Sequence, residues 1–437
     1  MRRYESYKDS GVEWMGEVPS HWEISSLGKI FLSVSEKNRP DLPLLSITRE
    51  LGVIERDTED QDSNHNFIPD DLSNYKILKK GQFGMNKMKA WQGSYGVSNF
   101  TGIVSPAYYI FDFIKSINPQ FFHWAIRSKI YVSFFGSASD GVRIGQWDLS
   151  KSRMKSIPFI IPSNNEQQKI AQFLDDKTAK IDQAVNLAEK QIALLKEHKQ
   201  ILIQNAVTRG LNPDVPLKDS GVEWIGQVPE HWEVKRFRNL FDFGKGLSIT
   251  KENLQDEGIP CVNYGEIHSK YGFEVIPERD ALKCVDSKYL VFKNSMLNKG
   301  DFVFADTSED IEGSGNFTYL NSSTRIFAGY HTVITRLKIT AIHRYIAYYF
   351  DSLSFRNQIR NEVKGVKVFS ITQSILKGTF MLLPNLKEQQ QIANYLDTQT
   401  AKIDQAIALK TAHIEKLKEY KNVLINDVVT GKVRVSV

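Results

Sequence analysis

The chain has 437 residues, of which 41% are hydrophobic and 24% charged, so it has enough apolar material for two or three globular domains. Its 14 Pro and 27 Gly are too few for a fibrous or disordered chain, and Cys261 and Cys284 alone provide neither a disulfide framework nor a zinc ribbon. The absence of long apolar runs argues against membrane spans and a signal peptide and predicts a cytoplasmic protein, while a net charge of +5 identifies no nucleic-acid partner by itself.

The chain contains a long internal repeat. Residues 8–24 (KDSGVEWMGEVPSHWEI) and 218–234 (KDSGVEWIGQVPEHWEV) are identical at 13 of 17 positions. Residues 166–185 and 388–407 are identical at 14 of 20 positions. A short box, a variable region and a helical box are therefore written twice. A period above 200 residues is too long for a solenoid and indicates a duplicated domain with an approximate internal two-fold axis.

The two variable regions, residues 20–160 and 230–384, are predicted to be mixed α/β domains. Short β-type runs alternate in them with Gly- and Asn-rich turns. The predicted strands include 155–161, 332–335 and 378–383, and the predicted helices are 119–131 and 342–360.

Charge is distributed unevenly along each variable region. Residues 23–71 carry 5 basic and 11 acidic side chains, whereas residues 72–160 carry 12 and 3. The second copy repeats this polarity, with 11 basic and 16 acidic side chains over 230–312 and 9 and 2 over 313–384. A basic latter half is the charge expected for contact with phosphates. The alternative is that the acidic half neutralises the basic half within the fold.

The helical boxes predict two long helices. Each has one apolar stripe with steps of three, four or seven residues, and residues 166–202 carry six basic and six acidic side chains. The predicted packing residues are Ile181, Val185, Ile192, Leu195 and Leu202 in the first helix and Ile403, Ile407, Ile414, Leu417 and Leu424 in the second. Each helix is expected to end near a glycine, Gly210 or Gly431. Because long exposed stripes need a partner, we expect an antiparallel coiled coil, with packing of each helix on its own domain as the alternative.

These features predict an α+β chain with an internal pseudo-two-fold repeat, in which two long helices separate two mixed α/β domains. The first domain, with its short box, spans residues 1–160, and a helical region follows at 161–210. The second domain, with a linker and its own short box, spans residues 211–384, and the second helical region covers 385–437.

Signatures of catalysis are missing from the sequence. The nearest match to the Asn/Asp-Pro-Pro-aromatic turn of an amino-methyltransferase, at 118–121, lacks the second proline. No phosphate-binding loop is present, and a loose nuclease-like pattern of Asp214 with Glu233 and Lys235 straddles a linker. The nine histidines lack metal-ligand spacing, and His21 and its repeat fit a packed tryptophan-rich segment better than an active site. We therefore expect a binding protein without its own catalytic residues, metal or cofactor.

Together these residues resemble the specificity subunit of type I restriction–modification systems. The resemblance rests on the two short boxes, on the repeated EQQxIAxxLDxxTAKIDQA, and on Val-Thr-Arg-Gly at 207–210 and Val-Thr-Gly at 429–431. It covers essentially the whole chain, although the variable regions match only loosely.

The resemblance implies a non-catalytic subunit that binds double-stranded DNA. Each target-recognition domain would read one half of a bipartite, gapped site, and the helices would set the gap and dock two methyltransferase subunits. S-adenosylmethionine would be bound by those methyltransferases, and ATP and Mg by two restriction subunits that join for cleavage.

Candidate DNA contacts are the basic and polar loops of the two variable regions, because base edges are read by Arg, Lys, Asn and Gln and phosphates by neighbouring cations. In the first domain the candidates are Lys87, Lys89, Trp91, Gln92, Arg143, Gln146, Lys151 and Arg153. In the second domain they are Lys364, Lys367, Ser370, Thr372 and Gln373. The alternative is that these are ordinary surface loops, with Trp91 and Trp147 in the core.

Two other function classes fit the sequence less well. A stand-alone bipartite DNA-binding regulator would bind its site tightly without a methyltransferase. A scaffold that holds two protein partners on its coiled coil would not bind DNA, and the charge polarity of the variable regions argues against it.

Overall fold

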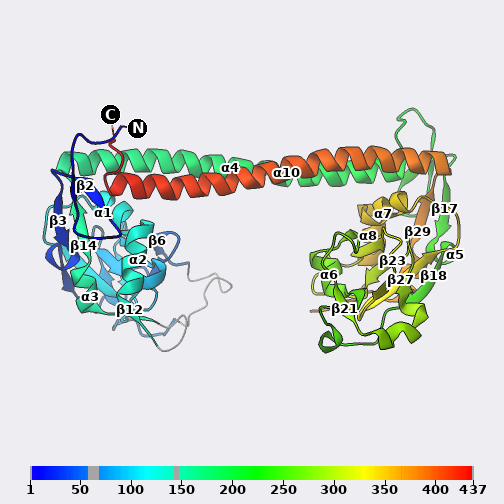
Figure 1. Cartoon of the computed structure of the whole chain (residues 1–437), viewed down its shortest axis with the longest axis horizontal. Helices are drawn as coiled ribbons and strands as arrows, with labels where there is room; N and C mark the ends of the chain where they lie inside the picture. Colours follow the sequence, from blue (N-terminus) through cyan, green and yellow to red (C-terminus); the bar gives the residue numbers. More distant parts are fainter. Residues whose placement is uncertain (1, 58–67, 142–146, 366, 436–437) are drawn as a thin grey trace. The chain divides into compact units, whose positions relative to one another are not determined.

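The computed structural model describes residues 2–57, 68–141, 147–365 and 367–435. The chain forms two compact units (Figure 1). The first unit comprises residues 1–189 and 411–437, and the second comprises residues 190–410. The units divide the chain differently from the four predicted sequence regions, because each unit includes about half of both long helices.

The first unit is built on an antiparallel sheet. The strand order is β4 (Phe31–Val34), β11 (Tyr109–Phe113), β8 (Phe83–Met85) and β9 (Tyr95–Val97). Further antiparallel pairs are β1 (Tyr7–Asp9) with β2 (Glu17–Pro19), β3 (Glu23–Ser26) with β14 (Pro158–Ile161), β5 (Leu45–Thr48) with β6 (Gly52–Glu55), β7 (Lys76–Leu78) with β10 (Gly102–Val104), and β12 (Ser139–Asp140) with β13 (Asp148–Leu149). The short helices are α1 (Pro119–Ile126), α2 (Lys129–Ser137) and α3 (Lys151–Ser156).

Aromatic side chains form the core against this sheet. The ring of Phe83, on β8, is fully buried and lies 5.1–5.9 Å from the rings of Phe31, Phe111 and Phe122. Phe122 belongs to α1, which begins where the Asn118 side chain accepts hydrogen bonds from two backbone amides of the first turn. The apolar face of α1 is therefore fixed against the sheet.

The second unit repeats this plan with more strands. Its main sheet has the order β18 (Phe241–Lys245), β27 (Thr332–Leu337), β23 (Phe302–Ala305), β25 (Phe317–Leu320) and β20 (Phe273–Val275), of which the last pair is parallel. A second sheet has the order β21 (Lys283–Val285), β19 (Ile259–Val262), β26 (Ile326–Ala328) and β22 (Met296–Leu297). Antiparallel pairs are β15 (Leu217–Asp219) with β16 (Gln227–Pro229), β17 (Glu233–Arg236) with β29 (Phe380–Leu383), and β24 (Thr307–Ser308) with β28 (Phe369–Ser370). The short helices are α5 (Phe237–Leu240), α6 (Tyr264–Ser269), α7 (His343–Asp351), α8 (Leu353–Arg360) and α9 (Gln373–Gly378).

Equivalent elements recur in the two units in the same chain order. The hairpin β1–β2 corresponds to β15–β16, and the pair β3–β14 corresponds to β17–β29. Helices α1 and α2 correspond to α7 and α8, and α3 corresponds to α9. The predicted fold class, two mixed α/β domains and two long helices in an internally repeated chain, is confirmed.

The two long helices, α4 (Asn164–Arg209) and α10 (Leu386–Val429), pair within each unit. In the first unit Lys421 donates to Asp182 at 2.7 Å, and in the second unit Lys199 donates to Asp404 at 2.7 Å. In the same unit Lys410 donates to Gln191 at 2.6 Å. Because a later residue of α10 contacts an earlier residue of α4, the helices run antiparallel, as predicted.

The predicted packing residues of these helices all lie on their buried or half-buried side. Ile181, Val185, Ile403, Ile414 and Leu424 are buried, and Ile192, Leu195, Leu202, Ile407 and Leu417 are half-buried. Gly210, directly after α4, and Gly431, two residues after the end of α10, adopt φ of 77° and 76°, which is the left-handed conformation of a glycine C-cap. None of the described helices is long and apolar enough to cross a membrane.

Some of the predicted elements differ in detail from the observed ones. Each predicted short helix is a pair of helices, because Ser128 and Ser352 interrupt it in extended conformation and begin a new helix. The strand predicted at 155–161 begins only at Pro158. Residues 155–156 belong to α3 instead, because the Ser150 side chain accepts a hydrogen bond from the Arg153 amide and starts a helical turn there.

Candidate nucleic-acid interface

A buried tryptophan joins the first domain to the long helices. The indole NH of Trp22 donates to Glu166, near the start of α4, at 3.3 Å, and His21 donates to the same carboxylate at 3.0 Å. Burial raises the pKa of Glu166, but the hydrogen bonds from His21, Ser163 and Trp22 outweigh this effect and hold the pKa below its ordinary value. Gly431, two residues after the end of α10, packs on Trp22, where a Cβ atom would lie 3.1 Å from the ring. The packing interpretation of the His-Trp pair thus agrees with the structure.

The second unit has the same joint. Trp232 and His231 donate to Glu388, near the start of α10, at 3.1 and 2.9 Å. Gly210, directly after α4, packs on Trp232, where a Cβ atom would lie 3.3 Å from the ring. Each joint therefore combines the start of one long helix with the end of the other, and this arrangement explains why the short and helical boxes are repeated together.

A second contact fixes each domain on its helix, and in the first unit its hydrogen-bond donors are uncharged. Asp175 of α4 accepts hydrogen bonds from the amide of Gln120 at 2.8 Å and from the indole of Trp124 at 2.7 Å. The Gln167 side chain accepts a hydrogen bond from the Asn118 backbone amide at 2.8 Å. These contacts orient α1 along α4.

In the second unit this contact is ionic. Asp397 of α10 accepts hydrogen bonds from Arg344 and from the hydroxyl of Tyr348, both at 2.6 Å. The Arg344 guanidinium also donates to Glu274 at 2.6 Å and lies 4.8 Å from the ring centroid of Phe273. Because Arg344 connects α7, β20 and α10, this ion-pair network sets the orientation of the second domain on its helix.

The loops of the first domain that were predicted to contact DNA lie side by side. Strands β12 and β13 form the base of the 140–148 loop, and Lys87 pairs with Asp148 at 3.1 Å. On the opposite strand Asp140 pairs with Arg153, the third residue of α3. Ion pairs thus attach Asp140 and Asp148, at the two ends of the loop, to neighbouring segments. The candidates Arg143 and Gln146 lie outside the described residues.

The two tryptophans of these loops contact each other. The rings of Trp91 and Trp147 lie 5.0 Å apart at 44°, and both side chains are half-buried, so neither is fully in the core. The buried indole NH of Trp91 has no acceptor among the described residues. Lys89 is exposed and Gln92 half-buried on the same short turn. This turn therefore presents polar groups next to an aromatic pair.

A lysine cluster extends this surface, and two of its members were not selected from the sequence. Burial and the positive charges of Lys37, Lys151 and Lys87 lower the pKa of Lys76. Lys37 and Lys76 lie opposite each other in an antiparallel bridge, while Lys151 donates to Ser33 at 2.9 Å. Like charges held together repel, so an anion such as a DNA phosphate would stabilise the cluster. The only signal for Lys76 in the sequence was the basic excess of residues 72–160, and Lys37, in the acidic half of the region, had none.

In the second domain the candidate residues divide into two groups. Lys364, Lys367 and Ser370 are exposed. Thr372 accepts a hydrogen bond from the Ile375 amide at 3.3 Å as the N-cap of α9, and Gln373 donates to the Gly244 carbonyl at 3.2 Å. These two polar groups are therefore partly used within the fold, while the exposed group is open to a ligand.

Gly365, two residues before Lys367, is required by the close approach of the neighbouring backbone. A Cβ atom at Gly365 would lie 2.2 Å from the backbone oxygen of Val368. A close turn of this loop thus explains the glycine without a ligand.

A cavity of about 740 Å³ lies beside β24 and the 365–370 loop. Its charged lining is mainly acidic, from Glu309, Asp310 and Glu312, and its wall includes His268, which is hydrogen-bonded to Asn316 at 2.8 Å. Carboxylates repel phosphates but accept hydrogen bonds from the exocyclic amino groups of cytosine or adenine. No sequence pattern indicated this site, because its lining comes from four separate segments.

The described residues contain no group of three or more His, Cys, Asp or Glu side chains placed to hold a metal ion. The interface candidates are cationic, amide, hydroxyl and aromatic groups. Their chemistry is that of binding phosphates and base edges.

Comparison with known proteins gives a consistent family. A family profile described as "Type I restriction modification DNA specificity domain" matches residues 19–192 and 229–419, one match for each copy of the repeat. The specificity subunit of the type I restriction enzyme MjaVIII from Methanocaldococcus jannaschii is 26% identical over 310 residues, which are 70% of this chain and 69% of the relative. The specificity subunit of EcoKI from Escherichia coli K12 is 26% identical over 326 residues, which are 71% of this chain and 64% of the relative.

Solved structures share the fold at low sequence identity. A chain from the work "Structural basis underlying complex assembly and conformational transition of the type I R-M system" has a TM-score of 0.72 and 13% identity, with 95% of this chain and 99% of that chain covered. The HsdS subunit from Thermoanaerobacter tengcongensis has a TM-score of 0.55 and 14% identity, with 95% of this chain and 98% of that chain covered.

Proposed function

Because this chain belongs to the type I restriction–modification DNA specificity family, we propose that it recognises a bipartite, gapped DNA site and that each unit reads one half. The observation that carries the proposal is the double match of the family profile, once in each copy of the repeat. Two domains with the same scaffold and different loop sequences fit two different half-sites. DNA sequence recognition is the role of this family.

The loops divide by the kind of DNA contact that they suit. The lysine cluster of the first unit (Lys37, Lys76, Lys87 and Lys151) suits phosphates, because it concentrates positive charge without a matching acidic group for each lysine. The loop that includes Arg143 and the exposed Lys367 suit base edges, where a forked or long cationic side chain reads guanine. The acidic cavity of the second unit suits an amino group on a base.

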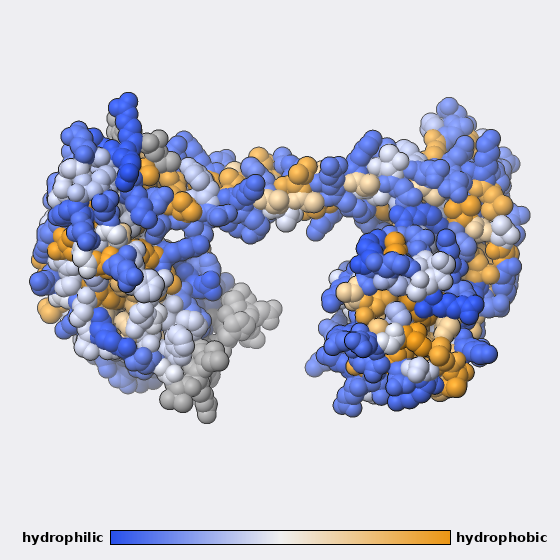
Figure 2. All heavy atoms as spheres, in the orientation of Figure 1, coloured by the Kyte–Doolittle hydropathy of each residue, from blue (hydrophilic) through white to orange (hydrophobic). Residues whose placement is uncertain are grey.

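The subunit acts without catalysis of its own, as a member of this family. In this proposal, two methyltransferase subunits that bind S-adenosylmethionine transfer the methyl groups. Two restriction subunits that use ATP and Mg cleave the DNA. Figure 2 shows hydrophobic residues on the visible face of the long helices. Within the second unit, Leu194 and Ile201 are exposed on α4 seven residues apart, which supports the docking of a partner helix there.

Replacement of a single domain tests the modular reading. A chain in which residues 20–160 come from another family member is expected to methylate a site with one new and one unchanged half. Adenine-methylation mapping of DNA from cells that carry the hybrid and its methyltransferase measures this directly. A change in both halves, or in neither, would contradict the proposal.

Insertions in the helices test whether they set the gap. Four residues added after Glu189 in α4 and after Lys410 in α10 lengthen each helix by about 6 Å and rotate it by roughly 40° beyond one full turn, so the buried stripe is nearly kept. Since DNA rises about 3.4 Å per base pair, the gap should grow by one or two base pairs with both half-sites unchanged. Two-residue insertions are the control, because a rotation of about 200° exposes the stripe and should abolish activity. An active enzyme with an unchanged gap would rule this role out.

A further inference from the structure

The loops between the two strands of β1–β2 and of β15–β16 are the same structure built twice. The side chain of Asp9 accepts a hydrogen bond from the Gly11 amide at 2.9 Å, and Asp219 accepts one from Gly221 at the same distance. Gly11 and Gly221 both have φ of 71°. Backbone hydrogen bonds of 3.0 and 3.1 Å to the Val12 oxygen close the first loop, and the equivalent bonds close the second. The loop conformation is therefore fixed by its own backbone and short side chains.

Each loop presents a tryptophan to solvent. Trp14 is 71% exposed and Trp224 is 45% exposed. Among the described residues neither indole NH has a hydrogen-bond acceptor, and neither ring contacts another aromatic ring. The hydrogen bonds that fix the loop therefore involve neither tryptophan side chain, and both copies have an exposed indole at this position. The neighbouring repeat residues differ in this respect, since Trp22 and Trp232 are fully buried.

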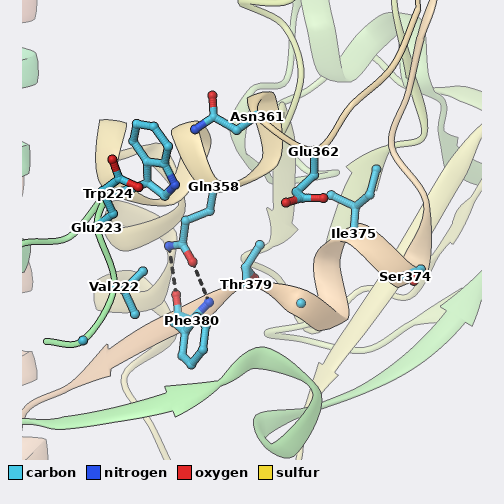
Figure 3. Close-up of a pocket in the computed structure, with 12 residues that line it drawn as sticks. Val222, Glu223, Trp224, Gln358, Asn361, Glu362, Ser374, Ile375, Thr379 and Phe380 are labelled. Atoms are coloured by element: carbon cyan, nitrogen blue, oxygen red, sulfur yellow. Dashed lines mark hydrogen bonds between the residues drawn. The ribbon is translucent and has the colours of Figure 1, made fainter.

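In the second unit Trp224 borders a cavity of about 490 Å³ (Figure 3). Ile375 and Thr379 line the opposite side, and the Gln358 side chain is held in place by two hydrogen bonds to the Phe380 backbone, at 2.7 and 3.2 Å. The cavity thus has an apolar wall, a fixed amide and a solvent-exposed indole, the usual components of a site for one side chain of a partner.

The charged groups at these loops are acidic. The charged residues that line the cavity are Glu223 and Glu362, and Glu13 is the equivalent of Glu223 in the first unit. None of the three forms an ion pair with a described residue. An arginine or lysine side chain can stack on an exposed indole and pair with a neighbouring carboxylate at the same time. Charge and shape therefore favour a cationic side chain over an acidic or purely apolar one.

From these observations we infer that Trp14 with Glu13, and Trp224 with Glu223, are two equivalent docking sites for a basic segment of the methyltransferase subunit, one subunit at each loop. The inference rests on the proposed function, which supplies two copies of one partner. Two loops that share the sequence Ser-Gly-Val-Glu-Trp and the same hydrogen bonds, on otherwise divergent domains, fit two identical partners, whereas DNA half-sites that differ in sequence would not require such similar loops. The acidic residues also disfavour DNA as the occupant.

The test is to count methyltransferase subunits bound to the full chain by native mass spectrometry and to measure their affinity by calorimetry. Trp14→Ala and Trp224→Ala should each weaken one of the two binding events about 30-fold, the loss expected for a central interface tryptophan, and the double variant should weaken both. Glu223→Lys should weaken the same event as Trp224→Ala. Val291→Ala, an exposed apolar change elsewhere in the second unit, is the matched control.

DNA binding by the chain alone is measured in parallel. The double variant is expected to bind specific DNA as tightly as the unchanged chain. Two methyltransferase subunits bound with unchanged affinity by the double variant would overturn the inference and leave the proposed function intact. Lost DNA binding with unaltered methyltransferase binding would also overturn it, in favour of DNA as the occupant. If the wild-type chain bound neither DNA nor methyltransferase, the proposed function itself would be contradicted.

Discussion

The two units share one contact and differ in another where each domain meets its long helix. In both, a buried tryptophan donates to a glutamate at the start of a helix, with distances of 3.3 and 3.1 Å. Next to this common joint, Asp175 accepts hydrogen bonds from an amide and an indole. Asp397 instead accepts hydrogen bonds from a guanidinium and a phenol hydroxyl. The repeat therefore preserves the attachment of the helices but has changed the contacts that orient the domains. This difference suggests that the orientation of each domain can be adjusted separately while the scaffold is kept.

The largest expected effect tests the common joint. Trp22→Ala and Trp232→Ala should each lower the free energy of unfolding of their own unit by about 3–5 kcal/mol, because each removes a fully buried ring and leaves a glutamate without its indole donor. Hydrogen exchange of β3 and β17, followed by mass spectrometry, measures the two units separately. Trp14→Ala is the control and should change stability by less than about 0.5 kcal/mol. Unequal effects of the two buried substitutions would show that the joints are not equivalent.

A smaller effect is expected from the orienting contacts, and it should be unequal. Arg344→Met should destabilise the second unit by about 2–3 kcal/mol, because Glu274 and Asp397 lose their shared cation. Gln120→Ala should cost the first unit only about 1 kcal/mol, because the indole of Trp124 still donates to Asp175. Hydrogen exchange of the backbone amides of α7 and α1 measures the loss of stability in each variant. Equal losses would argue that the ionic contact is no stronger than the neutral one.

The effect of Arg344→Met should also depend on pH. Burial raises the pKa of Glu274, but the hydrogen bond from Asn321 and the pairing with Arg344 and Arg279 outweigh it, so the pKa is lowered in the folded chain. A lowered carboxylate pKa stabilises the fold above the ordinary value of 4.5, and this contribution is lost as pH falls through the folded pKa. The difference between the variant and the unchanged chain should therefore shrink below about pH 4.5. A constant difference across this range would contradict the ionic explanation.

The smallest change in stability is expected in the lysine cluster. Lys37→Gln removes a repelling charge, so the first unit should be as stable or more stable by up to about 0.5 kcal/mol. DNA binding should weaken on specific and random sequences alike, and the slope of log K against log salt should fall by about one. Lys218→Gln, in the short box of the second unit, is the charge-matched control and should leave the slope unchanged. An unaltered slope for Lys37→Gln would place the cluster away from DNA.

The scaffold was predictable because its signals are local and periodic. Apolar spacing identified both long helices, and the repeated boxes identified the duplication. The interruption at Ser352 was missed, because an apolar pattern continues through a residue whose hydroxyl accepts a hydrogen bond from the Phe355 amide and begins a new helix. Single-residue capping contacts of this kind are not visible in hydrophobic periodicity.

The interface was predictable only in part. Lys87, Trp91 and Arg153 were selected by residue type from separate segments. In the structure Lys87 pairs with Asp148, Arg153 pairs with Asp140, and Trp91 contacts Trp147. Lys37 and Lys76 are 39 residues apart and meet only through a strand bridge, so no linear pattern indicated them. The network around Arg344 likewise joins residues 274, 344 and 397, which no local spacing connects.

The contacts between the two chain ends have a consequence for the order of folding. Tyr7 donates to the backbone oxygen of Gly431 at 3.1 Å, and the Arg434 amide donates to the oxygen of Arg2 at 2.9 Å. The second unit is continuous in sequence, from 190 to 410, so it can complete its structure while synthesis still continues. The first unit also needs residues 411–434, which follow the second unit in the chain. Of the two units, the one whose synthesis begins earlier is therefore completed later, and until then the half of the α4 stripe that α10 will cover stays open to chaperones.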